Sequence, residues 1–156
     1  MKFLCDQMLG TLAKWLRLFG FDTFYANSEM EDEELLQVAK KEGRVIITRD
    51  KQLIARVKKE KLPVIEVNTT DLDEQLNLVL KNVYLDQKAI LSRCSVCNTV
   101  LDKVKKSEVK NKVPKKIFDN NEKFWFCSKC DKVYWMGSHY DKIINKIDEV
   151  KKLQNG

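Results

Sequence analysis

The sequence of 156 residues is 44% hydrophobic and 33% charged, which provides enough apolar side chains for a core and argues against disorder. Its longest apolar runs cover four or five residues, too few to span a membrane, and the acid at position 6 argues against a secretory signal, so we expect a soluble cytoplasmic protein. The net charge of +6 is uneven, because residues 1–90 carry a net −1 and residues 91–156 a net +7.

The first ninety residues alternate four times between a strand-like and a helix-like pattern. The predicted strands cover residues 2–5, 21–26, 45–48 and 64–67. The predicted helices run from Met8 to Gly20, from an N-cap at Asp32 to about Gly43, over residues 53–57, and from a cap at Thr70 or Asp71 to Leu80. Short apolar strands between helices are typical of a parallel sheet with helices on both faces, so we predict an α/β fold class.

Residues 86–93 are predicted to form a linker that divides the chain into residues 1–88 and 89–156. After it, residues 103–116 look like a long basic loop interrupted by Pro114. Aromatic, strand-like segments then cover residues 124–126 and 133–135, and an amphipathic helix is predicted from Asp141 onward. The second half is therefore expected to be a small domain with a C-terminal helix.

Four of the five cysteines form two CxxC pairs, Cys94 with Cys97 and Cys127 with Cys130. Two such pairs supply four thiolates, the ligand set of a closed, tetrahedral structural zinc site. A redox dithiol or two disulfides are the alternatives, which a cytoplasmic location disfavours. Cys5 lies in an apolar run and is expected to be a buried side chain.

Acidic residues lie where three of the four predicted strands end. Asp6 comes directly after the first strand, Asp50 follows the third, and Asp32 stands at the start of the second helix. Because parallel strands end at one edge of a sheet, these carboxylates could converge there, and hard oxygen ligands suit Mg²⁺ or Mn²⁺. Each acid also has a simpler interpretation, since an acid at the start of a helix is usually a cap.

The basic second half favours a polyanionic partner, of which nucleic acid is the simplest, although a lysine-rich solvated surface has the same composition. Candidate RNA contacts in the basic loop are Lys105, Lys106 and Lys112. Close in sequence to the acids, Lys14, Arg17 and Arg49 could contact the same strand. Trp125, Tyr134 and Trp135 could stack on bases but are first expected to pack the small core, and His139 is more simply a polar side chain than a base or a metal ligand.

Several segments match one known family in order along the chain. They are residues 3–6, 8–10, 12–17, 20–23, 32–36 and 43–50, both CxxC pairs, and residues 132–139. Over essentially residues 1–140 the chain resembles the Mut-seven carboxy-terminal RNase family, which joins a PIN-like nuclease fold to a zinc ribbon. The resemblance implies metal-dependent RNA cleavage with Asp6, Asp32 and Asp50 at the acidic positions. It also implies a fourth acid after the fourth strand, for which Asp71 is the nearest candidate.

We therefore expect a metal-dependent ribonuclease that leaves a 5′-phosphate and a 3′-hydroxyl, with a structural zinc ribbon that aids RNA binding. The main alternative is a catalytically silent zinc-ribbon module that binds RNA or assists the assembly of a ribonucleoprotein. In that alternative the acids are only helix caps. A further alternative is the toxin of a toxin–antitoxin pair, which the ribbon makes less natural.

Overall fold

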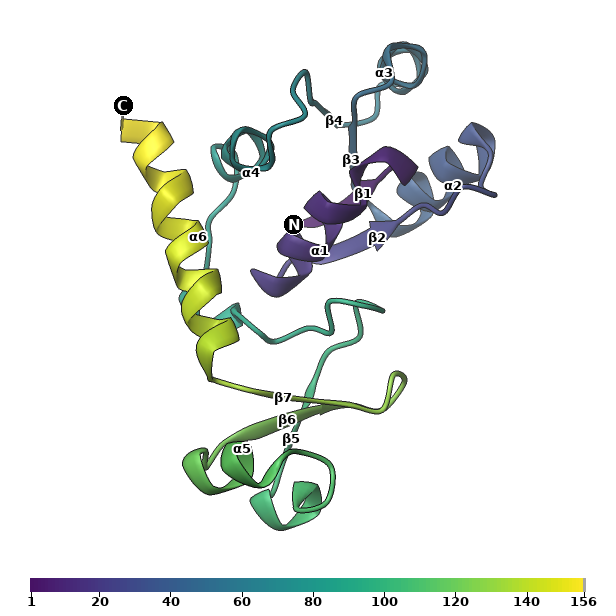
Figure 1. The fold of residues 1–156 in the computed structure, drawn as a ribbon. Helices are drawn as coiled ribbons and strands as arrows, with labels where there is room; N and C mark the ends of the chain where they lie inside the picture. The colour runs from purple at the N-terminus through teal and green to yellow at the C-terminus, as the bar shows by residue number, and fades with distance from the viewer. Residues whose placement is uncertain (156) are drawn as a thin grey trace.

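A computed structural model describes the backbone of residues 1–155 and the side chains of residues 1–154 (Figure 1). Its first half is a four-stranded parallel sheet in the order β2-β1-β3-β4. The strands are β1 (Lys2–Cys5), β2 (Asp22–Tyr25), β3 (Val45–Thr48) and β4 (Val64–Glu66). The helices between and after them are η1 (Gln7–Leu9), α1 (Gly10–Leu18), α2 (Asp32–Glu42), α3 (Lys51–Lys59) and α4 (Leu72–Leu80).

Helices cover both faces of this sheet because successive strand side chains point to opposite sides. In β1, Phe3 and Cys5 join one buried cluster with α1 and α4, whereas Leu4 joins a second cluster with α2 and α3. Ile47 and Ile46 of β3 divide between the same two clusters. The predicted fold class is therefore confirmed, and the buried alternation is the feature that produces it.

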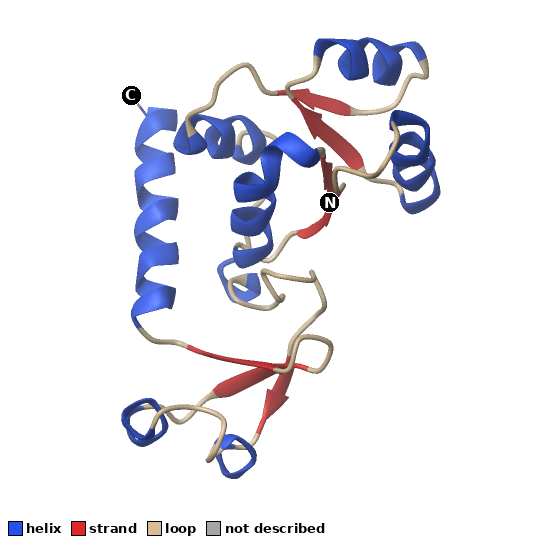
Figure 2. Ribbon diagram, turned by 45° about the vertical axis from the view of Figure 1, so that its right-hand side comes forward, coloured by secondary structure: helices blue, strands red, loops and turns tan. Residues whose placement is uncertain are grey.

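The second half contains a three-stranded antiparallel sheet and a long C-terminal helix (Figure 2). The sheet order is β5-β6-β7. Its elements are η2 (Gln87–Ala89), β5 (Asp102–Val104), η3 (Lys106–Val109), α5 (Lys115–Asn120), β6 (Phe124–Cys127), β7 (Lys132–Trp135) and α6 (Ser138–Asn155). The predicted basic loop is thus largely structured, because Val109 is buried with Phe124 and Val133 in a cluster of its own.

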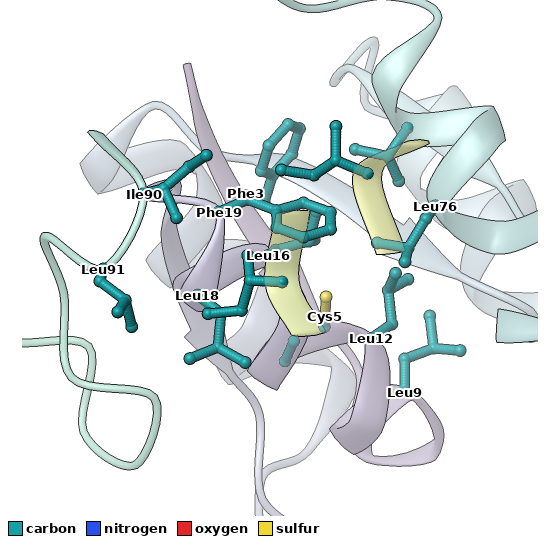
Figure 3. Close-up of a cluster of buried hydrophobic side chains, with 14 of the residues drawn as sticks. Phe3, Cys5, Leu9, Leu12, Leu16, Leu18, Phe19, Leu76, Ile90 and Leu91 are labelled. Atoms are coloured by element: carbon teal, nitrogen blue, oxygen red, sulfur yellow. The ribbon is translucent and has the colours of Figure 1, made fainter. Parts of the chain in front are cut away.

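The two halves share a continuous core across the predicted linker (Figure 3). Ile90 and Leu91 are buried, and the Leu91 amide donates a hydrogen bond of 3.0 Å to the Leu18 carbonyl. Gly20 has φ +98°, and a Cβ there would lie 2.3 Å from the Ala89 carbonyl oxygen. The segment predicted as a linker is therefore packed against the end of α1, for which only glycine leaves room.

The C-terminal helix packs on the same side of the molecule as α1 and α4. Ile143, Ile147 and Val150 are buried in the cluster that contains the α4 residues Leu76 and Val79. Figures 1 and 2 both show α6 beside α4, with α1 between α6 and the four-stranded sheet. Among the described residues, no helix combines the length and the apolar character needed to cross a membrane.

Candidate functional site

The strand order places a topological switch point between β1 and β3, where the chain first moves to β2 and then returns to the other side. Crevices at such points, beyond the carboxyl ends of parallel strands, are the usual ligand sites of open α/β sheets. Asp6 directly follows β1, and Thr48 is the last residue of β3. The Thr48 hydroxyl donates a hydrogen bond to Asp6 Oδ2 and accepts one of 3.0 Å from the Asp50 amide. One hydroxyl therefore links the two strand ends.

Asp6, Asp32 and Asp50 line one small hollow of about 50 Å³, which we call the acid hollow. Its other lining residues are Gln7, Met8, Ala26, Asn27, Met30, Leu35 and Leu53. A water needs only about 10–15 Å³ of such space, so the hollow can hold a few waters or a partly hydrated ion. The three acids come from three successive β-to-α connections, which is why residues far apart in sequence meet there.

The side chains of these acids differ in their local roles. Asp50 is the N-cap of α3, since its Oδ1 accepts from the Gln52 amide at 2.8 Å and the Leu53 amide at 3.3 Å. Asp6 is only 6% exposed, and its Oδ1 accepts a bond of 3.1 Å from the Met8 amide. The prediction that Asp32 is an N-cap is wrong, because Glu31 holds that position and Asp32 is the first helical residue. Capping therefore explains Asp50 but not Asp32.

The electrostatics of the hollow favour a cation. Burial raises the pKa of Asp6, and the charges of Asp50 and Asp32 raise it further, while hydrogen bonds from Thr48 and the Met8 amide act in the opposite direction. A bound divalent cation would offset both the desolvation and the mutual repulsion. Within residues 1–154, however, the only group of three or more His, Cys, Asp or Glu side chains arranged to hold a metal is the cysteine cluster. The three carboxylates line one hollow but do not form such a group.

The other candidates near this edge have mixed placements. Asp71 is the N-cap of α4, accepting a bond of 2.9 Å from the Glu74 amide, and does not line the acid hollow. Lys14 is exposed on α1. Arg49 lines two further hollows of about 330 and 350 Å³ beyond the ends of β3 and β4, and its Nε is buried without a partner among the described residues. Arg49 is thus a cation with hydrogen-bonding capacity left over.

Arg17, in contrast, points into the molecule. It is 8% exposed, its Nε donates to the Thr23 carbonyl at 2.9 Å, and its Nη1 donates to the Ser95 and Val96 carbonyls at 3.3 and 2.9 Å. This arginine fastens α1 and β2 to the segment around the first cysteine pair. The Arg17 guanidinium is therefore bonded inside the chain and is not available to contact RNA.

The four cysteines of the CxxC pairs form the cluster described above. Their sulfurs all lie within 4.8 Å of one another, Cys97 and Cys127 at 3.4 Å, and all four cysteines are free thiols. A tetrahedral zinc with Zn–S bonds of about 2.3 Å would hold its sulfurs about 3.8 Å apart, so the spacing fits. In each pair the residue after the second cysteine is left-handed, Asn98 at φ 72° and Asp131 at φ 53°. Two matching turns thus bring the pairs together.

Hydroxyl groups lie beside two of the four sulfurs. The Tyr134 hydroxyl lies 3.2 Å from Cys94 Sγ, and the Thr99 hydroxyl lies 3.1 Å from Cys97 Sγ. Against the opposing effect of burial, hydrogen bonds to Thr99 and Cys127 lower the pKa of Cys97 to about 6, whereas hydrogen bonds to the first cysteine pair and burial raise the pKa of Cys127 and Cys130. Thiolates are the form that binds zinc, and partners of this kind fix their orientation. The sequence did not predict that the hydroxyls of Tyr134 and Thr99 lie beside cysteine sulfurs, because nothing in the positions of these two residues indicates such a contact.

The lysines of the predicted basic loop lie on the far side of the small sheet. Lys106 pairs with Glu122 at 3.0 Å and lies 4.8 Å from the Phe118 ring centroid. Lys112 is 3.8 Å from Asp131, while Lys105 is exposed. Figures 1 and 2 both show η3 and α5 at the end of the molecule farthest from the four-stranded sheet. These lysines are therefore on the surface, but away from the acid hollow.

Comparison with known proteins adds a family to this geometry. A family model described as "Mut7-C RNAse domain" matches residues 1–147. A curated relative from Homo sapiens, named "Exonuclease mut-7 homolog", is 32% identical over 99 residues, which are 60% of this chain and 11% of that relative. The chain thus corresponds to a small part of the relative's length. No solved structure matches the chain.

Proposed function

Because the chain belongs to the Mut7-C RNAse domain family, as its motifs predicted, we propose that it is a metal-dependent ribonuclease whose reaction centre is the acid hollow. Family membership suggests nuclease activity, and the proposal adds the site, the metal and RNA as substrate. The observation that carries it is the meeting of Asp6, Asp32 and Asp50 in one hollow at the switch point of the sheet. Of these, Asp32 has no capping role that would account for it.

The oxygen donors of the hollow fit Mg²⁺ or Mn²⁺, which prefer carboxylates and retain waters. Asp6, Asp32 and Asp50 would hold the ion, and the Thr48 hydroxyl fixes the Asp6 carboxylate in place. When bound, such an ion supplies a Lewis acid that lowers the pKa of water and offsets charge on a phosphodiester. Before an ion binds, burial and the negative charges of Asp50 and Asp32 raise the pKa of Asp6 and so favour its protonated form.

The surrounding cations would orient the RNA. Arg49 lines two hollows at the ends of β3 and β4, where its guanidinium could contact a phosphate. Lys14 is exposed on the helix that begins at the acid hollow. The four cysteines would hold zinc in a closed site, which leaves no position open for catalysis, so the zinc is structural.

The proposal is tested by cleavage of a fluorescent single-stranded RNA in the presence of Mn²⁺. Asp6→Asn, Asp32→Asn and Asp50→Asn are each expected to abolish cleavage while RNA binding remains. Asp71→Asn is the matched control, because this exposed cap lies outside the hollow, and it should cleave like the natural protein. Full activity of Asp6→Asn would overturn the assignment.

One observation favours the non-catalytic alternative, since the Asp50 carboxylate caps α3 and so has a structural role without any metal. RNA binding that is independent of Mn²⁺, with no cleavage by the natural protein, would support that alternative. The toxin alternative receives no such support from the described residues.

A further inference from the structure

A pocket distinct from the acid hollow lies between β7 and the start of α6. It has a volume of about 240 Å³ and is lined by Lys132, Val133, Tyr134, Trp135 and His139. Pockets for drug-sized ligands are usually about 300–1,000 Å³, so this one suits a single planar ring system. Two aromatic rings, an imidazole and an ammonium group in one pocket are the groups that hold an unpaired base and its phosphate.

The position of the indole in this pocket depends on the residue after the strand. A Cβ at Gly137 would lie 2.8 Å from Trp135 Nε1 and 2.9 Å from its Cδ1. The glycine therefore lets the indole lie against the backbone where α6 begins. Tyr134 is held from the other side, because its hydroxyl is bonded to Cys94 Sγ and to the Ser95 amide at 3.2 and 3.3 Å. Both rings of the pocket are fixed before any ligand binds.

The charge around the pocket is positive and largely unpaired. Lys132 lines the pocket, and the partial burial of the His139 imidazole together with the charges of Lys14, Lys132 and Lys142 lowers the pKa of His139. None of the three lysines takes part in an ion pair within the described part of the chain, whereas Lys106 and Lys112 each face an acid. Lys132 Nζ lies 5.1 Å from the centroid of the Tyr134 ring, but no ion pair of these three lysines within the described residues has to be broken before they contact a phosphate.

The exposed face of α1 connects this pocket to the acid hollow. Met8 borders the hollow, and Thr11 and Lys14 follow at intervals of three residues, which places them on one side of the helix. Met8 and Thr11 also line the neighbouring hollow that contains Arg49. Figures 1 and 2 show α1 lying between the four-stranded sheet and α6. A strand of RNA could thus run from the acids along α1 to the ribbon.

We propose that the pocket of Lys132, Trp135 and His139 binds one unpaired nucleotide of single-stranded RNA, with the base on Trp135 and the phosphate among Lys14, Lys132 and Lys142. This inference deepens the proposed function, because it assigns RNA to the β7–α6 side of the ribbon and not to the lysines of η3 and α5. It also defines a course for the RNA across the molecule, from the acid hollow along α1 to the ribbon. The RNA must be unpaired at this point, since a stacked base is not free to enter the pocket.

The first test measures binding, which does not depend on cleavage. The full chain, without added Mg²⁺ or Mn²⁺, is titrated with a fluorescein-labelled uridine oligonucleotide of about ten nucleotides, within the usual range of single-strand site sizes. Lys132→Ala with Lys142→Ala is expected to reduce the slope of log affinity against log salt concentration by about 1.4, or about 0.7 for each lost phosphate contact. The matched control is Lys110→Ala with Lys115→Ala, two exposed lysines outside the pocket, which should leave the slope unchanged. Equal losses from both pairs, or none from either, would overturn the proposal.

The second test examines stacking. RNA binding should quench the tryptophan fluorescence, and Trp135→Phe should remove that quenching although Trp15 and Trp125 remain. His139→Ala, at an exposed position, should weaken binding without affecting folding. Trp135→Ala should weaken it by about 5- to 150-fold, the range that stacking gives in alanine substitutions. Full quenching in Trp135→Phe, together with unchanged affinity in His139→Ala, would contradict the pocket.

These readouts separate the pocket from the nuclease proposal. Cleavage that is abolished by Asp6→Asn, with unaltered binding by the pocket variants, would refute the pocket and leave the nuclease. Binding that depends on the pocket, without any cleavage, would support the pocket and count against the nuclease.

Discussion

Arg17 is the residue whose replacement best tests how the two halves are joined. Its guanidinium donates to three carbonyls, one in β2 and two in the first cysteine turn, at 2.9, 3.3 and 2.9 Å. The side chain is only 8% exposed, so water cannot readily replace it. Arg17→Ala therefore leaves three carbonyls without their donor and opens a gap between α1 and the zinc site.

The expected loss can be worked from these contacts. A hydrogen bond to a charged group contributes about 1.5–3 kcal/mol, and a buried carbonyl left without its donor costs about 1–3 kcal/mol. Because the three bonds share one guanidinium they do not add fully, so we expect a loss of about 3–5 kcal/mol. Arg56→Ala is the matched control. Arg56 pairs with Glu33 at 2.6 Å, but the two side chains are 44% and 61% exposed, so only about 0.2–1 kcal/mol should be lost.

The free energy of unfolding of the zinc-saturated protein is measured by urea denaturation, monitored by circular dichroism. The slope of this free energy against urea concentration is compared between variants. Arg17→Lys should fall between the natural protein and Arg17→Ala, since lysine keeps the charge but cannot form the fork. If Arg17→Ala is no less stable than Arg56→Ala, the interior role is refuted.

Three further outcomes are expected. Asp6→Asn should raise the free energy of unfolding at neutral pH, because the raised pKa of the Asp6 carboxyl disfavours its charged form in the fold. The natural protein loses this stability as pH rises through that pKa, whereas the uncharged amide does not. The difference between the two proteins, measured by urea unfolding, should therefore vanish below about pH 4. Gly20→Ala should lower the free energy of unfolding by well over the ~1 kcal/mol of a left-handed alanine, because a Cβ would meet the Ala89 carbonyl at 2.3 Å. Gly43→Ala is the control, since Gly43 has φ +65° and a Cβ there would meet nothing within 4 Å; it should lose only ~1 kcal/mol. Thermal unfolding measures both losses. Cys94→Ser should lower the zinc content measured by elemental analysis and unfold the ribbon, and an unchanged zinc content would contradict the four-thiolate site.

Much of the first half could be predicted because its signals are local. The runs at residues 2–5 and 45–48 are short, apolar and followed by helical spacing, and both are central strands buried on two faces. The acids follow from the same reasoning, since the carboxyl ends of parallel strands meet at one edge. Helix boundaries were less certain. The N-cap position of α2 is Glu31 and not Asp32: residue 31 has an extended backbone and makes no side-chain capping bond, so the preference for Asp at N-caps places the start of this helix one residue too late.

Features that depend on contacts between distant residues could not be predicted. Arg17 looks like the partner of Lys14 on an exposed helix face, yet it is buried by Ser95, 78 positions away. Residues 86–93 have the polar composition of a linker, but Ile90 and Leu91 complete the core beside α1. Likewise the basic run after the first cysteine pair contains η3 and α5, whose few apolar residues pack against Phe124. The few apolar residues of a lysine-rich segment join a core only when another part of the chain packs against them, so composition alone does not identify them.

The cysteine cluster is connected to the acid hollow through the edge of the four-stranded sheet. β2 is an edge strand, and an uncovered edge presents unpaired backbone groups. Asn98, the left-handed residue after the first cysteine pair, covers it: its Oδ1 accepts from the Thr23 amide at 3.0 Å and its Nδ2 donates to Asp22 at 2.7 Å. The turn after the first cysteine pair thus also satisfies one backbone amide of the edge strand.

Downstream of this covered edge, β2 leads directly to Ala26 and Asn27, which line the acid hollow. If the cysteine cluster binds zinc, loss of the metal is expected to loosen the turn that holds Asn98 and, with it, the strand that positions that wall. We therefore propose that the ribbon supports the acid hollow without touching it, by fixing the edge strand from which one side of the hollow is built. A cleavage defect in Cys94→Ser would follow even if the ribbon made no contact with RNA.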